Sequence, residues 1–418
     1  MDNKVKHYQP TKLVLALVVS LFFLWSLTSN LIPVLIPLLK KVCLLTDFQS
    51  AFIDSAYWIA YFVMAIPCAL LMQRYSYKTV IIMGLTIAAV GAFLFYPAAL
   101  VGKYGFFLFA LFLVASGMTF LETAANPYIS VLGDKKTATQ RINFAQAFNG
   151  LGAVVATFYL SRLIITDNTH TFDSLKSLPI AEQEVVRATL ASALKMPYVS
   201  IGLVLMLFAL LFLVTKMPSM DDNKAKNAFS FHFDVFNNKN YRLGVLSQFF
   251  YVGGQVCISS FFIRLATFKG MAETDATKLL GPLLLCFMIG RFVGTFLMKY
   301  LSPSLLLALF SIVNVVLLFT AVQTTGVTAV YLMFGVEFFM SIMYPTIFSL
   351  SINNLGEKTK SAASFLVMAI VGGALIPLVM GKVSDHSNIQ TAYLVPMICF
   401  LPVAFFGWYN FKFSKDEE

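Results

Sequence analysis

Long apolar runs recur along the whole chain, and each is long enough to cross a bilayer. About 20 residues are needed for a helix to span a hydrocarbon layer about 30 Å thick. Because such a layer offers no water to the backbone, each run is expected to be a helix. Twelve runs meet this length, near residues 13–39, 48–72, 79–101, 105–132, 142–166, 196–215, 243–268, 279–298, 303–323, 327–352, 361–381 and 391–411.

The composition indicates an all-α membrane protein. Of the 418 residues, 59% are hydrophobic and 12% are charged, which would leave a soluble globule without enough polar surface to cover itself. The net charge of +10 raises nucleic acid as a partner, but the basic residues lie in short gaps between apolar runs and form no patch with interleaved aromatics. The expected partner is therefore the lipid bilayer and not nucleic acid.

The basic residues predict the orientation of the helices. With the N-terminus inside, 18 of the 30 Lys and Arg residues fall in cytoplasmic segments and 9 on the opposite side. This bias indicates that both termini are cytoplasmic.

A polar gap in the middle of the chain divides the runs into two groups of six. The stretch LMQRYS at 71–76 recurs loosely as LMKYLS at 297–302, and LGDK at 132–135 recurs as LGEK at 355–358, at offsets of 226 and 223 residues. These repeats indicate a parallel six-helix duplication. The predicted domains are an N-terminal half at 1–216, a cytoplasmic linker at 217–242 and a C-terminal half at 243–418.

One apolar run contains a carboxylate, in the stretch FLETAANP at 120–127. Glu122 lies about 15 Å inward from the Leu132 end of its span, close to the bilayer centre. An ionised group at that depth is costly and usually faces a cavity, so Glu122 is a functional candidate. The alternative is a structural glutamate that bonds a neighbouring helix.

Other polar or amphipathic side chains inside the runs are candidates for binding a small polar molecule. Gln146 and Asn149 are spaced i and i+3 and share one helix face, and their amides suit hydroxyl groups. Tyr344 lies about 15 Å from its cytoplasmic loop, at the position in the second half that corresponds to Asn126 and Pro127. The alternative role for the two amides is interhelical hydrogen bonding, and the alternative for Tyr344 is a ring that faces lipid or the protein core. The further candidates are Asn126, Gln255, Trp25 and Asn30.

Two arginines also lie near span interiors and need partners. The sequence offers Asp275 and Glu337 for Arg264 and Arg291 without choosing between them. These arginines are interpreted as structural or gating residues.

Motifs of enzymes and of metal sites are absent from the sequence. The four His residues are isolated, and there is no HExxH, GxSxG or GxxxxGK[ST] sequence. The five Cys residues have no CxxC spacing. No catalytic residue, metal or cofactor is expected.

Several longer motifs resemble one known family. GMTFLETAANPYISVLG, INFAQAFNGLGA, QFFYVGGQ, MSIMYPTIFSLSINNLGEKTKSAASFLVMAIVGGA and PLVMGKVSDHSNIQTA are similar, in order, to the bacterial L-fucose/proton symporter (fucose permease) family of the major facilitator superfamily. The resemblance implies twelve transmembrane helices in two six-helix bundles, a place in the bacterial inner membrane, and import of fucose or another hexose or amino sugar with protons.

The resemblance also suggests roles for individual residues. By matching position, Glu122 looks like the family's membrane-embedded glutamate that contributes to proton coupling. Gln146, Asn149 and Tyr344 look like its cavity-lining residues.

The chain departs from the family pattern at two places. Pro33 stands where the family's first span carries a proton-binding aspartate, and Ser259 stands at or near the place of a tryptophan. Asp54 and Pro33 are both about 10 Å below the outer surface on neighbouring antiparallel spans. One hypothesis is that Asp54 replaces the missing acid; the alternative is an outer-leaflet residue hydrated by the loop.

The predicted function is therefore secondary transport of a sugar by proton symport with alternating access, by a monomer. An uncoupled sugar facilitator is the nearest alternative because Pro33 cannot titrate. A sugar sensor without transport would be expected to carry a large signalling segment, and a sugar acid would be favoured if Arg264 faced the cavity.

Overall fold

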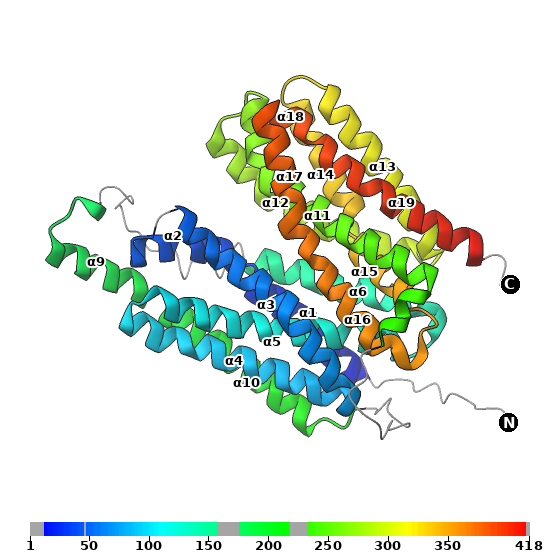
Figure 1. Ribbon diagram of the computed structural model, residues 1–418, viewed down its shortest axis with the longest axis horizontal. Coiled ribbons are helices and arrows are strands. Elements are labelled where there is room, and N and C mark those ends of the chain that lie inside the picture. The colour runs from blue at the N-terminus through cyan, green and yellow to red at the C-terminus, as the bar shows by residue number, and fades with distance from the viewer. Residues whose placement is uncertain (1–11, 46, 157–174, 218–231, 415–418) are drawn as a thin grey trace. The chain divides into compact units, whose positions relative to one another are not determined.

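The computed structural model describes residues 12–45, 47–156, 175–217 and 232–414, and its elements are helices connected by short loops (Figure 1). The α-helices before the linker are α1 (Lys12–Ser29), α2 (Ile32–Cys43), α3 (Asp47–Arg74), α4 (Tyr77–Val101), α5 (Tyr104–Val131), α6 (Ala138–Val155), α9 (Ile180–Ser192) and α10 (Lys195–Val214), with a 3₁₀ turn η1 (Lys135–Thr137). Those after it are α11 (Lys239–Phe268), α12 (Glu273–Leu297), α13 (Pro303–Gln323), α14 (Thr328–Met340), α15 (Met343–Ile352), α16 (Thr359–Met368), α17 (Gly372–His386), α18 (Ile389–Ala392) and α19 (Leu394–Ser414), with 3₁₀ turns η3 (Phe233–Asn237), η4 (Gly356–Lys358) and η5 (Ala369–Val371).

By length and composition, the described residues contain eleven helical segments that could cross a membrane. They coincide with eleven of the twelve predicted spans. The remaining prediction, 142–166, begins within α6, and its residues after 156 lie outside the described part of the chain. The prediction of an all-α, multi-pass membrane protein is confirmed.

Short polar residues mark the start of several helices. The side chain of Ser76 accepts the N–H of Thr79 at 3.3 Å, and that of Asn238 accepts the N–H of Tyr241 at 3.1 Å. Such N-caps satisfy backbone donors that have no partner inside the helix. At the other end of α4, Gly102 adopts the left-handed conformation with φ of 66°, which glycine reaches without steric cost.

The first predicted span, 13–39, is not one helix but two. The chain turns at residues 30 and 31, between α1 and α2. Pro33 lies in the first turn of α2, and it has no N–H to donate to the Ser29 carbonyl. The first turn of a helix is the position that proline favours, and the break precedes Pro33.

The predicted span 327–352 is broken in the same way. It consists of α14 and α15, with Ser341 and Ile342 between them. Pro345 cannot donate to the carbonyl four residues earlier, which is that of Ser341. The break therefore leaves a carbonyl in the middle of a membrane span that needs another donor.

Two other predicted boundaries differ from the structure. The segment before the predicted span 196–215 already contains the helix α9. The predicted span 361–381 begins as α16, passes through η5 and continues as α17 to His386. Gly372 is the first residue of α17, and a Cβ there would overlap the Phe249 carbonyl, so the position excludes larger residues.

The helices form two compact units. The α4 unit contains Ser20–Ala125 and Gly152–Lys226, and the α11 unit contains Met1–Val19, Asn126–Leu151 and Asn227–Glu418. The predicted division into halves at 217–242 stays a prediction, and residues 218–231 of that linker lie outside the described part of the chain.

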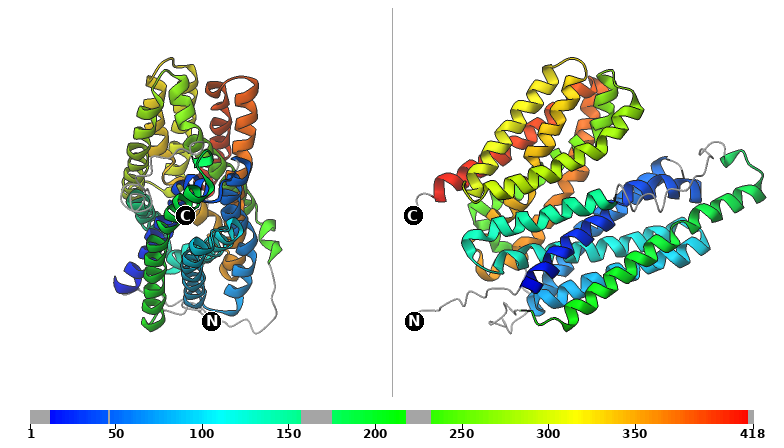
Figure 2. Two further views of the ribbon diagram at one scale, coloured as in Figure 1. Left: turned by 90° about the vertical axis from the view of Figure 1, so that its left-hand side faces the viewer. Right: turned by 180° about the vertical axis from the view of Figure 1, so that it is seen from behind.

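Neighbouring helices inside each unit pack closely. In the α4 unit, α4 and α10 run side by side (Figure 1), and the rings of Phe95 and Tyr198 stack at 3.7 Å. In the α11 unit, α13 runs beside α19, as the view from behind also shows (Figure 2). A Cβ on Gly407 of α19 would lie 2.6 Å from the Ala308 nitrogen of α13. Small residues thus permit close backbone contact, as is usual between membrane helices.

Helices α4 and α5 approach closely at another glycine. A Cβ on Gly117 of α5 would overlap the Gly84 carbonyl of α4 and would lie 2.6 Å from the Ala88 Cβ. Backbone atoms cannot move aside like a flexible side chain, so the position excludes larger residues. This contact sets the distance between α4 and the helix that carries Glu122.

We predict that Gly117→Ala destabilises the folded protein by about 1–3 kcal/mol through overpacking. The melting temperature in detergent should fall measurably. Gly105→Ala is the control, because Gly105 is exposed near the start of the same helix and a Cβ there meets no atom within 4 Å. Equal melting temperatures for the two variants would contradict the prediction.

Candidate functional site

A chain of hydrogen-bonded hydroxyl groups links α1 and α3 in the α4 unit. The indole N–H of Trp25 donates to the Tyr61 hydroxyl at 2.6 Å, and the hydroxyls of Tyr61 and Tyr57 are 3.1 Å apart. The Tyr57 hydroxyl lies 2.5 Å from that of Ser29, which donates to the Trp25 carbonyl at 2.9 Å. Tyr57 and Tyr61 are almost fully buried.

The donors in this chain follow one consistent order. Because an indole N–H can only donate, Tyr61 accepts from Trp25 and is free to donate to Tyr57. The Ser29 hydroxyl donates its proton to the Trp25 carbonyl, so it accepts a hydrogen bond from the Tyr57 hydroxyl. Each phenol then keeps an oxygen lone pair that can accept from another polar group.

Glu122 lies in the same unit as this hydroxyl chain. Its side chain on α5 is 2% exposed, and it interacts electrostatically with both Tyr57 and Tyr61. The hydroxyls of Thr119 and Thr123 on either side donate to carbonyls of their own helix at 2.9 and 2.7 Å. The buried position predicted for the carboxylate is thus observed, and it interacts electrostatically with two phenols that the sequence did not point to.

Four other residues considered from the sequence lie between the start of α1 and the end of α3: Trp25, Asn30, Pro33 and Asp54. Asn30 lies in the turn after α1, and its amide donates to the Ser26 carbonyl at 2.9 Å and the Ser26 hydroxyl at 3.0 Å. Trp25 and Asn30 are both half-buried. Asp54 is on α3 and Pro33 is on α2, and their side chains lie outside what the structure describes.

The amide candidates of the α11 unit form a second polar chain. The Gln146 amide donates to the Asn126 side-chain oxygen at 3.3 Å. The backbone carbonyl of Gln146 accepts a hydrogen bond from the guanidinium of Arg291 at 2.6 Å. Asn126, Gln146 and Arg291 are each at most 4% exposed, so this chain connects α5, α6 and α12 inside the protein.

Arg291 also supplies the donor that the break between α14 and α15 requires. Its Nε donates to the Ser341 carbonyl at 2.8 Å, the carbonyl that Pro345 leaves without an N–H. The guanidinium also lies 4.6 Å from the centre of the Phe287 ring. Among the described residues no carboxylate forms an ion pair with Arg291; backbone carbonyls take that role.

Arg264 and the acids Asp275 and Glu337 were the other residues considered for arginine ion pairs. Arg264 is exposed and lies over the Phe261 ring at 5.4 Å. Asp275 pairs with Lys278 of its own helix at 3.0 Å. Neither Asp275 nor Glu337 is therefore observed as an arginine partner in the part of the chain that the structure describes.

Helix α6 is joined to α15 by buried side-chain hydrogen bonds. The hydroxyls of Thr139 and Ser349 are 2.8 Å apart, and the Asn143 amide donates to the Thr346 hydroxyl at 3.1 Å. All four side chains are buried. Polar contacts of this kind hold membrane helices together, and the sequence did not predict them.

Three further candidates lie in the α11 unit. Tyr344 of α15 is buried and its ring lies roughly parallel to that of Phe348 at 6.4 Å. Asn149 of α6 and Gln255 of α11 are half-buried. All three residues lie in helices at the predicted spans. Their roles in binding stay predictions.

A second buried carboxylate lies in the α11 unit. Glu337 of α14 is 2% exposed, and the Ser259 hydroxyl of α11 donates to its Oε1 at 3.4 Å. The sequence offered Glu337 only as a counter-ion. The signal that could have identified it was its depth, because it is nine residues from the start of α14 at Thr328, or about 14 Å.

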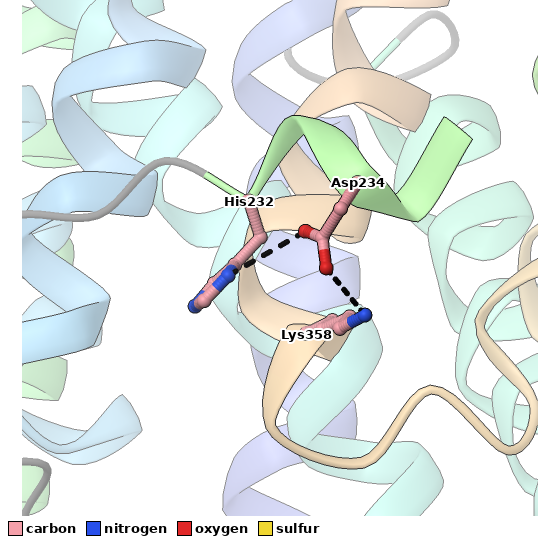
Figure 3. Close-up of polar contacts among 3 residues, drawn as sticks. All are labelled: His232, Asp234 and Lys358. Carbon is pink, nitrogen blue, oxygen red and sulfur yellow. Dashed lines mark ion pairs between the residues drawn. The ribbon is translucent and has the colours of Figure 1, made fainter. Parts of the chain in front are cut away.

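Outside the spans, a small charged cluster joins the turn η3, which precedes α11, to the turn η4, which precedes α16. The ammonium of Lys358 lies 2.5 Å from Asp234 Oδ2, and His232 lies 3.6 Å from Asp234 Oδ1 (Figure 3). The hydrogen bond from Lys358, aided by its charge, lowers the pKa of the Asp234 carboxyl below its ordinary value. The side chains of the cluster are exposed, and we interpret the cluster as a surface ion pair.

Comparisons with known proteins agree with the fold and with the sequence motifs. A family model described as Major Facilitator Superfamily matches residues 17–376. The chain is 38% identical over 401 residues to the L-fucose-proton symporter of Escherichia coli K12, covering 94% of this chain and 92% of that protein. It is 37% identical over 390 residues to a glucose/galactose transporter of Brucella abortus, covering 93% and 91%. The crystal structure of FucP in the outward conformation matches with a TM-score of 0.89 and 38% identity, covering 95% of this chain and 98% of that one.

We predict that Asp234→Asn lowers the melting temperature slightly near neutral pH and not in strong acid. A lowered pKa means that the pair stabilises the folded state above the ordinary pKa of aspartate, and that this contribution is lost as the pH falls through the lower folded-state value. The difference from wild type should therefore shrink below about pH 4. In a Lys358→Met background the substitution should have a smaller effect, because only the contact with His232 remains of the cluster. A difference that persists unchanged in acid would contradict the prediction.

Proposed function

This chain belongs to the bacterial L-fucose/proton symporter family of the major facilitator superfamily, and from this premise we propose that it imports a sugar together with protons. Relatives are named as carriers of L-fucose and of glucose and galactose, so the substrate proposed is fucose, another hexose or an amino sugar. The proposed location is the bacterial inner membrane, with both termini in the cytoplasm, as the distribution of basic residues indicates. The carrier is proposed to work as a monomer.

The observation that carries the proposal is the buried Glu122 beside the phenols of Tyr57 and Tyr61. An ionised carboxylate is costly inside a membrane and its protonated form is not. Protonation of Glu122 therefore makes reorientation of the loaded carrier favourable. Phenol oxygens with a remaining lone pair supply acceptors for the proton that the carboxyl group then carries.

The sugar contacts are proposed to come from amides and aromatic side chains. Amide groups both donate and accept, which suits neighbouring sugar hydroxyls, and aromatic faces suit the apolar face of a sugar ring. Because the amides of Gln146 and Asn126 already bond each other, their orientation is set before the sugar binds. The proposed sugar-binding residues are Trp25, Asn30, Asn126, Gln146, Asn149, Gln255 and Tyr344.

Transport is proposed to follow alternating access, in which the halves 1–216 and 243–418 rock about the sugar site. The hydrogen bonds of α6 with α15 and of Gln146 with Arg291 join helices of the two proposed halves. They are the contacts that a change of access has to break and remake. A proton entering down 100 mV supplies roughly 2.3 kcal/mol, enough for about a fifty-fold sugar gradient at one-to-one stoichiometry.

An uncoupled facilitator is the second candidate, and Pro33 is the observation that favours it. Proline cannot titrate, so the acid expected at that place is missing. The two functions are separated in proteoliposomes that contain a pH-sensitive dye. Lumenal acidification evoked by external L-fucose, D-glucose or D-galactose supports symport, and intact sugar counterflow without acidification would overturn it in favour of the facilitator.

We predict that Glu122→Gln lowers proton-driven sugar accumulation by about tenfold or more. Glutamine resembles the protonated acid and cannot release a proton, so sugar counterflow should persist. Glu182→Gln is the matched control, because Glu182 is exposed on α9. Accumulation equal to wild type in the Glu122 variant would show that the coupling group lies elsewhere.

Asp54 is proposed as the acid that replaces the one missing at Pro33. The expected result is that Asp54→Asn reduces sugar uptake driven by an inward pH gradient by about tenfold, with counterflow retained. If Asp54 is instead a hydrated residue of the outer leaflet, the variant will take up sugar like wild type. That result would remove Asp54 from the mechanism.

A further inference from the structure

Glu337 has a setting unlike that of the other described acids of the α11 unit. It is 2% exposed and lies well inside the candidate membrane segment Thr328–Ile352. Among the described residues it has one hydrogen bond, from the Ser259 hydroxyl, which is long at 3.4 Å. In the described part of the chain no Lys, Arg or His forms an ion pair with it.

Ionisable groups on the neighbouring helices do not neutralise Glu337. Helices α11, α12 and α13 pack against α14, and α13 contains no ionisable residue. On α12 the guanidinium of Arg291 donates to the carbonyls of Ser341 and Gln146, and the Cys286 thiol donates to the Phe334 carbonyl at 3.3 Å. Both groups are thus bonded to the backbone.

The phenols that interact with Glu337 also donate their protons to backbone carbonyls. Tyr251 of α11 and Tyr393 both interact electrostatically with the carboxyl group. Tyr251 donates to the Met340 carbonyl at 3.0 Å, and Tyr393 donates to the Ile258 carbonyl at 3.4 Å. Among the described residues, then, the hydroxyl of Ser259 is left as the donor to Glu337.

These contacts determine which form of the carboxyl group the site accepts. A buried charge requires a counter-ion or several hydrogen bonds, and a neutral carboxyl group requires neither. With one long hydrogen bond and no ion-paired cation among the residues that the structure describes, the site of Glu337 suits the protonated acid. Water reaching the site in another conformation would favour the ionised form and release the proton.

A purely structural role does not account for this arrangement. A hydrophobic residue of similar size would pack between α11, α12 and α14 without the cost of a buried polar group. Side chains that only join helices usually have matched donors and acceptors at short distance, as Thr139 and Ser349 do at 2.8 Å. Glu337 lacks such a match.

We propose that Glu337 is a further proton-binding site of this carrier, located on α14 and hydrogen-bonded by Ser259 of α11. The inference rests on the proposed function of proton symport. The proton enters from the side where water reaches the carboxylate, travels on the neutral carboxyl group and leaves to water on the other side. No other reactant is needed.

The test uses the full-length protein in proteoliposomes, with whichever of L-fucose, D-glucose or D-galactose the wild type transports. Proton and sugar entry are measured together for wild type, Glu337→Gln and Glu337→Asp, with Asp275→Asn as an exposed control on α12. In Glu337→Gln the ratio of protons to sugar entering should fall about twofold or more while counterflow persists, because one of the coupled proton sites is lost. Glu337→Asp, which keeps an acid, should retain more of the wild-type ratio.

An independent readout follows the proton itself. Infrared difference spectra between neutral and alkaline pH should show the carbonyl stretch of a protonated carboxylic acid in wild type, and this band should be lost in Glu337→Gln. An unchanged flux ratio, or an equal fall in counterflow and proton entry, would overturn the inference. A wild type without any sugar-evoked proton entry would instead refute the proposed symport. If Glu337→Gln fails to fold, Glu337→Asp and Ser259→Ala decide, because a flux ratio and band position unchanged in both would also overturn it.

Discussion

A bilayer supplies no water to an unpaired carbonyl or to a lone charge, and the arrangement of this protein depends on that constraint. Where Pro345 interrupts a membrane span, the Ser341 carbonyl loses its donor, and the guanidinium of Arg291 replaces it at 2.8 Å. The same guanidinium bonds Gln146 on α6. One helix break thus explains why a cation is buried here without an ion-paired carboxylate among the described residues. The guanidinium connects α12 to α6 and to the turn between α14 and α15.

The same constraint makes the two buried acids informative. Glu122 is accompanied by Tyr57 and Tyr61, whose hydroxyls are ordered by Trp25 and Ser29. Glu337 has the single long hydrogen bond from Ser259. Both carboxyl groups are buried in membrane segments, where the ionised form is costly, and this favours a carboxyl group that gains and loses a proton over one that stays ionised.

The positions of most membrane spans could be predicted because a span requires a long run of apolar residues, which is visible in the sequence. Length and apolar composition located the helices, and counting residues at 1.5 Å each placed Glu122 deep in its span. The breaks at Pro33 and Pro345 were missed although both prolines are visible. Apolar content alone does not show where a span is interrupted, and proline is often accommodated within membrane helices.

The site was less predictable than the fold. Tyr57 and Tyr61 resemble many other aromatic residues in an apolar chain, and only the approach of α1 to α3 reveals that they form a hydrogen-bonded chain. Arg291 could have paired with Glu337 as far as the sequence shows. The carbonyl left by Pro345 decided otherwise, since a nearby acceptor of fixed position needs no second buried charge.

The sequence by itself determined the class of protein, the places of the spans and the family, because these depend on apolar length and on extended motifs along the chain. Only the tertiary structure decided which polar groups meet, because partners such as Asn143 and Thr346 or Ser259 and Glu337 lie far apart in the chain. A hydrogen bond depends on distances of about 3 Å. Spacing along one helix cannot supply those distances until the helices are packed.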